Sequence, residues 1–358
     1  MINVLWIDDE ASIVESAIAS AEQEDICLIH KLNWAEAKEE LKDNKDKIEA
    51  VIFDCYCAME RGESANDEFL INAISELKDI YGKKNIPWYV YSGGTKNGNT
   101  PVEKQVIKNR DWDKSWPFRY YTKSKTLSFD DCVHCTLSED GMIINKYGEV
   151  IGKDGESHFK TMLCRLKRAV EETPERKIRV RFSDIFEILE RENYCFKENV
   201  YGNMLTLLKA VYLNEEPENP DNYYNSIRQI FENIFLIFKD FGIIPNDIYF
   251  NARRPTDINF ANCKKFLLYD CLDEIERKGI KKKYVDNIFS QTIAKELICF
   301  VNICNDFSHI KSDRDRGFAN KYALFSCVMA LCEALRQMDD YLRKNPNKEE
   351  NEKKVISI

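Results

Sequence analysis

The sequence of 358 residues is long enough for two domains, each with its own hydrophobic core. Apolar residues make up 44% of it, but no window holds the roughly 18 uncharged apolar residues that a membrane span needs. With 13 glycines and 9 prolines, the composition excludes collagen and low-complexity repeats and favours a helix-rich chain. The net charge of −9 argues against DNA as a partner, because phosphate binding depends on clustered Lys and Arg.

Residues 1–125 alternate between short apolar runs typical of β-strands and amphipathic stretches typical of helices. This alternation predicts an α/β domain with a doubly wound, five-stranded parallel sheet of the flavodoxin-like type. Ligands of such sheets bind beyond the carboxyl ends of the strands. The predicted strands are 3–7, 26–32, 50–53, 87–91 and 118–122, and the predicted helices are 10–23, 34–45, 66–81 and 101–109.

Residues 126–175 interrupt the alternation. The run DGMIINKYGEVIGKDG predicts a hairpin with Asp-Gly and Tyr-Gly turns, and a connecting helix follows it. Cys132, His134 and Cys135 have the spacing of zinc and redox sites. Structural zinc normally has four ligands, and the sequence holds no second pair of cysteines with this spacing, so we favour free thiols over a zinc site.

The rest of the chain is dominated by a hydrophobic period of 3.6 residues. Residues 176–343 therefore predict an all-α output domain. Residues 344–358 are polar and contain a proline, so we expect a flexible tail. The first residues carry acids straight after a short apolar run and lack the features of a signal peptide, which indicates a cytoplasmic protein.

Polar residues follow four of the predicted strands. Asp8 and Asp9 follow the first strand, Asp54 the third, Ser92 the fourth and Lys123 the fifth. In a parallel sheet these positions converge at one edge, where clustered carboxylates repel one another unless a cation is present. They predict an Mg²⁺ site, and the hydroxyl and ammonium groups suit a phosphoryl group on Asp54. Each acid alone is also explained as a helix N-cap. N-capping does not explain why acids follow two strands while a serine and a lysine follow two others.

The pattern resembles the receiver domain of two-component response regulators. The resemblance is carried by IDDE at 7–10, by Asp54 at the end of AVIFD, and by residues of YVYSGG and YYTKS. It implies that Asp8, Asp9 and Asp54 bind Mg²⁺ and that Asp54 accepts phosphate from a histidine kinase.

The same resemblance implies roles for three residues of the last two strands. Ser92 and Lys123 would contact the phosphoryl group, and Tyr120 would be the aromatic residue that reports the state of the switch. Lys153, which follows another β-like run, is the alternative to Lys123.

The segment ELICFVNICNDFSHIKSDRDRG in the helical part resembles the HEPN superfamily, whose dimers cut RNA. Asn305 and His309 fit its motif, but Cys304 stands where the family has Arg, and a neutral thiol cannot stabilise phosphate charge. Arg228 is one candidate to replace that cation in space. The alternative, which we favour, is that Asn305 and His309 cap helix ends and hydrogen-bond across a dimer.

We therefore expect a response regulator of a phosphorelay, phosphorylated by a histidine kinase. Its helical output would act by protein–protein interaction, with a homodimer as the expected assembly and neither DNA nor a membrane as a partner. We do not expect an enzyme. Two alternatives stay open: a receiver-gated ribonuclease that uses His309 on RNA, and a pseudo-receiver scaffold that is never phosphorylated.

Overall fold

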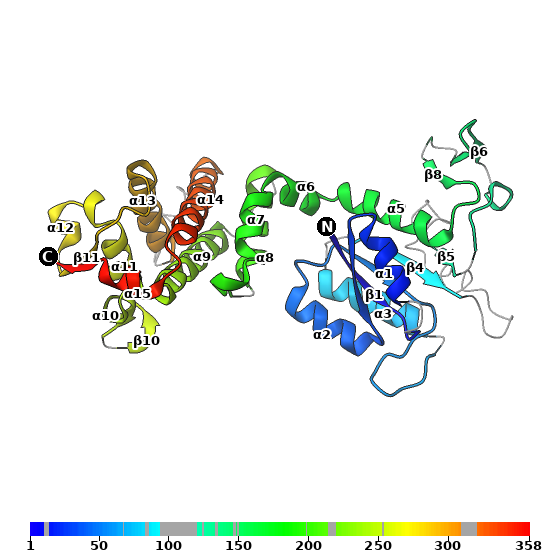
Figure 1. Ribbon diagram of the computed structural model, residues 1–358, viewed down its shortest axis with the longest axis horizontal. Helices are drawn as coiled ribbons and strands as arrows, with labels where there is room; N and C mark the ends of the chain where they lie inside the picture. The colour runs from blue at the N-terminus through cyan, green and yellow to red at the C-terminus, as the bar shows by residue number, and fades with distance from the viewer. Residues whose placement is uncertain are drawn as a thin grey trace. The chain divides into compact units, whose positions relative to one another are not determined.

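The computed structural model describes most of the chain, and its residues fall into two compact units, 1–176 and 177–358 (Figure 1). The boundary lies within α6 (Pro174–Arg181). None of the described helices is both long and apolar enough to cross a membrane. The described residues are 1–10, 14–66, 68–82, 86–93, 120–123, 125–132, 135–145, 148, 150–197, 199–213, 220–252, 254–308 and 321–358.

A five-stranded sheet forms the centre of the first unit. All its neighbouring strands are parallel, in the order β2-β1-β3-β4-β5, which confirms the predicted parallel sheet. The register pairs Ile7 with Phe53 and Ser92 with Thr122, so the carboxyl ends of neighbouring strands align. The strands are β1 (Ile2–Ile7), β2 (Ile26–Lys31), β3 (Ala50–Phe53), β4 (Trp88–Ser92) and β5 (Tyr120–Thr122).

Helices pack on both faces of this sheet, because successive strand residues point to opposite sides and nearly all of them are apolar. Leu5 and Val51 face one core with α2 (Trp34–Asn44) and α3 (Phe69–Tyr81). The adjacent strand residues Val4 and Ala50 point to the opposite face. There they form a second core with α1 (Val14–Glu22) and α5 (His158–Glu171).

The placement of α5 differs from the sequence prediction of a connecting helix. Met162, Leu163 and Leu166 of α5 are fully buried in the second of these cores, so this helix belongs to the first unit. The periodicity of the sequence predicted the helix but not the surface that it covers.

The segment between β5 and α5 forms a small antiparallel sheet of three strands, one more than the predicted hairpin. Its order is β6-β7-β8, around a core of Leu127, Ile143 and Ile151. Strand β6 has only two residues, which is too short for sequence periodicity to reveal. The strands are β6 (Thr136–Leu137), β7 (Met142–Ile144) and β8 (Val150–Lys153).

The second unit is mainly helical, but the prediction of a purely α domain is wrong. Two short antiparallel pairs interrupt the helices: β9 (Phe250–Asn251) with β10 (Arg254–Ile258), and β11 (Lys282–Tyr284) with β12 (Val355–Ser357). The helices are α7 (Ser183–Leu189), α8 (Asn199–Tyr212), α9 (Pro220–Asp240), α10 (Asn246–Tyr249), α11 (Phe260–Leu267), α12 (Glu274–Arg277), α13 (Gln291–Ser308), α14 (Lys321–Lys344) and α15 (Lys348–Lys353). One large apolar core joins them, except for α12 and α15, which contribute no residue to it.

The predicted flexible tail, residues 344–358, instead forms α15 and β12. Lys354 Nζ lies 2.7 Å from Asp286 Oδ2 and donates to Asn345 Oδ1 at 2.8 Å. Asn351 is 1% exposed and donates to the Phe241 carbonyl at 3.0 Å. Polar contacts with residues distant in sequence hold this segment in place, and its hydrophilic composition could not reveal them.

Candidate functional site

The carboxyl ends of four strands meet at one edge of the sheet. Asp8 and Asp54 follow the adjacent strands β1 and β3, and the Asp54 amide donates to the Ile7 carbonyl at 2.8 Å. Ser92 is the last residue of β4, and its carbonyl accepts from the Lys123 amide at 2.8 Å. Backbone bonds of the sheet therefore fix where each predicted side chain begins.

Three carboxylates gather there, as the sequence predicts. Asp8, Asp9 and Asp54 each offer an oxygen, and these oxygens all lie within 4.8 Å of one another. Asp8 and Asp54 are buried, whereas Asp9 is exposed. A set of hard carboxylate oxygens with one side open to solvent fits Mg²⁺, which takes few protein ligands and keeps several waters.

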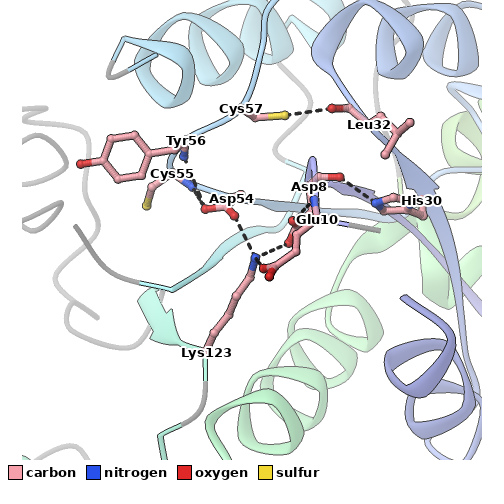
Figure 2. A network of polar contacts seen from close by, with 9 residues as sticks. All are labelled: Asp8, Glu10, His30, Leu32, Asp54, Cys55, Tyr56, Cys57 and Lys123. Atoms are coloured by element: carbon pink, nitrogen blue, oxygen red, sulfur yellow. Dashed lines mark hydrogen bonds and ion pairs between the residues drawn. The ribbon is translucent and has the colours of Figure 1, made fainter. Parts of the chain in front are cut away.

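The Lys123 ammonium lies among these acids (Figure 2). Its Nζ is 2.8 Å from Asp8 Oδ2, 2.9 Å from Asp54 Oδ2 and 3.2 Å from Glu10 Oε2. The alternative, Lys153, belongs to β8, and its side chain lies beside Gly141. Its Cε is 3.8 Å from the point that a Cβ on this glycine would occupy. The lysine beside the acids is therefore Lys123.

Burial and charge act in opposite directions on the two central groups. Burial, reinforced by repulsion from Asp54, raises the pKa of Asp8 despite its contact with Lys123. Burial favours a neutral Lys123, but the negative charges of Asp54 and Asp8 outweigh it and raise the pKa of that ammonium. The lysine stays charged, and Asp8 retains its proton to a higher pH than an exposed aspartate.

The loop after β3 orients the Asp54 carboxylate. Its Oδ1 accepts from the amides of Cys55 and Tyr56, which leaves Oδ2 directed at Lys123 (Figure 2). The Cys55 thiol is buried, and the neighbouring Ser92 side chain opposes part of the rise that burial causes in the pKa of this thiol. Burial raises the pKa of both Cys55 and Cys57, the latter to about 12, which keeps these thiols neutral.

Sequence reasoning missed two residues that touch the site. Glu10 contributes a carboxylate to Lys123, and its place within IDDE was the available signal. His30 lies in β2, and its Nε2 is 2.7 Å from the Asp8 carbonyl oxygen. No sequence pattern marked His30, because its contact is to backbone on a neighbouring strand.

Several predicted residues lie wholly or partly outside the described residues. Tyr120 belongs to β5 and Asn305 to α13, but their side chains are not described. His309 and His134 are not described at all. Arg228 lies in α9 and forms an ion pair of 3.2 Å with Glu232.

The edge of the sheet thus combines oxygen ligands for a divalent cation with a buried carboxylate that an ammonium faces. Such a set can neutralise the charge of a phosphoryl group while a carboxylate oxygen attacks it. Among known proteins, no family model and no curated protein matches the sequence.

Proposed function

We propose that the first unit is a phosphoacceptor domain of the receiver type, wound by helices on both faces of its sheet. The observation that carries this proposal is the position of Lys123 Nζ, 2.9 Å from Asp54 Oδ2 and 2.8 Å from Asp8 Oδ2. An N-cap needs no such cation. A buried nucleophilic carboxylate beside metal ligands does, because a phosphoryl donor brings more negative charge to it.

Asp8, Asp9 and Asp54 would hold Mg²⁺, which supplies positive charge against the phosphoryl oxygens when bound. An Asp54 oxygen attacks the phosphorus of a phosphohistidine on a cytoplasmic kinase. The new O–P bond forms as the N–P bond breaks, and the imidazole leaves with the N–P electron pair. The Lys123 ammonium and the Ser92 hydroxyl then bind phosphoryl oxygens.

The acyl phosphate would change the contacts of its neighbours. Its oxygens compete with the carboxylates of Asp8 and Glu10 for Lys123, and they attract the Ser92 hydroxyl. Ser92 ends β4 and Lys123 directly follows the neighbouring strand β5, so these two strands respond together. We propose that this response governs the binding of a protein partner, or of a second copy, by the helical unit.

Acetyl phosphate with Mg²⁺ tests the proposal on the full chain by intact mass. We expect the mass of one added phosphoryl group, loss of the adduct when EDTA is present during labelling, and no adduct on Asp54→Asn. Asp79→Asn is the matched control, since Asp79 is an exposed acid of α3.

Absence of an adduct on folded protein that also binds no Mg²⁺ would favour the pseudo-receiver scaffold. The ribonuclease alternative depends on Asn305 and His309, and no described side chain supports it. It stays a prediction of the sequence.

A further inference from the structure

A pocket of about 620 Å³ lies in the second unit, far along the chain from the acidic site. It is lined by the end of α9 and the loop after it, by α15, and by all three residues of β12. Its volume is in the range of binding sites rather than of a gap that holds one water.

The lining is rich in positive charge although the chain is acidic. Among the described residues, Lys239, Lys282 and Lys348 line the pocket, with Glu352 as the single acid. Lys239 and Lys282 pair with exposed carboxylates, at 2.9 and 2.7 Å, and exposed pairs of this kind are weak. No ion pair involves Lys348 among the residues that the structure describes. An anionic ligand would therefore meet Lys348 directly and would compete with the exposed Asp240 and Asp247 for the other two ammonium groups.

One side of the pocket is the free edge of a strand. Val285 N donates to Lys354 O, and Ile358 N donates to Lys281 O, on either side of the pair Lys283–Ile356. Hydrogen-bonded and non-hydrogen-bonded pairs alternate along an antiparallel ladder. The backbone of Ile356 therefore bonds to β11, whereas the backbones of Val355 and Ser357 do not. The amides and carbonyls of Val355 and Ser357 thus point away from β11, and both residues line the pocket.

Apolar side chains lie between the charges. Ile244, Phe250 and Val355 belong to the lining, and Ile356 is 40% exposed. A strand that pairs with β12 places alternate side chains on opposite faces, so one set meets this apolar surface and the other meets lysines or solvent.

We propose that this pocket binds an extended acidic peptide of a partner protein, which adds a strand to the free edge of β12. The lysines select acidic side chains, and the backbone of Val355 and Ser357 supplies the pairing. A single small anion would use the lysines but leave the strand edge and the apolar lining without a role. The proposal does not depend on phosphorylation of Asp54.

The first test uses the full chain and a fluorescein-labelled octapeptide of alternating glutamate and valine, followed by fluorescence anisotropy. We expect saturable binding, and a loss of affinity of about tenfold or more for Lys348→Glu. Lys353→Glu is the matched control, because it makes the same charge change on α15 at an exposed position outside the lining, and binding should stay within about twofold.

The second test separates strand pairing from charge alone. A peptide N-methylated at alternate amides keeps its acids but loses the donors for β12, and we expect affinity to fall by about tenfold. Ser357→Pro should act similarly, since proline at this position removes an amide that does not bond to β11.

Three results would overturn the proposal: no binding of the octapeptide, equal binding of the methylated peptide with displacement by inorganic phosphate, or self-association of the chain through β12 that excludes the peptide. The methylated peptide keeps the test decisive even if Ser357→Pro fails to fold.

Discussion

Lys123 decides the charge balance of the acidic site. Four carboxylates, those of Asp8, Asp9, Glu10 and Asp54, surround or adjoin its single ammonium. With all groups ionised the cluster carries −3, since one positive charge offsets one of four negative charges. Burial, reinforced by the charge of Asp54, raises the pKa of Asp8, and a divalent cation would offset part of the excess negative charge.

Replacing this lysine tests its structural role. We expect Lys123→Met to lower the free energy of unfolding by about 3 kcal/mol in EDTA, because it leaves two buried carboxylates without their cation. Urea unfolding measures the loss, and Mg²⁺ should restore part of it. Lys125→Met, at an exposed neighbour, is the control. Equal stability of the two variants would mean that Lys123 does not neutralise the acids.

Asp8 should make stability depend on pH. Its pKa lies above the ordinary 3.8 in the folded protein, so the folded state keeps a proton that the unfolded state has released. The free energy of unfolding therefore falls as pH rises from 3.8 through the folded pKa, by at most about 1.4 kcal/mol per pH unit.

Urea unfolding in EDTA across this range measures the slope. Asp8→Asn should flatten it, whereas Asp79→Asn, at an exposed site, should not. An unchanged slope in Asp8→Asn would show that another group binds the proton.

At the scale of elements, α15 is held against the turn that ends α9. Gly242 has φ +76°, and a Cβ there would lie 2.6 Å from the Lys348 carbonyl oxygen and 2.8 Å from Glu352 Cγ. Gly279 has φ +94°, but a Cβ added to it would meet no atom within 4 Å. The two glycines therefore share a left-handed backbone and differ in their contacts.

This pair allows a matched prediction. Both Gly→Ala variants should lose about 1 kcal/mol from the backbone conformation, and Gly242→Ala should lose a further 1–3 kcal/mol or so because the backbone of α15 cannot move freely aside. Thermal unfolding compares them. Equal losses would mean that α15 is not tightly packed on this turn.

The elements that the sequence predicted are those whose stability is local. The apolar runs of β1 and β3 are buried on both faces, so they are visible without knowledge of their partners. Strand β12 and α15 escaped prediction because their support comes from distant residues such as Asp286 and Phe241.

The same distinction applies to the candidate site. Acids, a serine and a lysine after successive strands could be placed together once a parallel sheet was assumed. The contact of His30 with the Asp8 carbonyl and the ion pair between Lys123 and Glu10 depend on side-chain directions that a sequence does not contain.

At the scale of the whole molecule, α6 carries the chain from one unit to the other. Within the first unit, Arg176 donates to the Met1 carbonyl at 3.4 Å and to Glu49 at 3.5 Å. Within the second, the guanidinium of Arg179 lies 5.5 Å from the Tyr201 ring centre and that of Arg181 lies 4.6 Å from the Tyr212 ring centre. Each end of α6 is thus anchored to its own unit.

Chemical trapping of the phosphorylated residue tests the central claim most directly. Full-length protein treated with acetyl phosphate and Mg²⁺, then reduced with borohydride and digested, converts an aspartyl phosphate to homoserine that peptide sequencing by mass can locate. We expect homoserine at position 54 alone, and none when EDTA replaces Mg²⁺. Homoserine at another acid, or none in folded protein that binds Mg²⁺, would contradict the assignment of Asp54 as the phosphoacceptor.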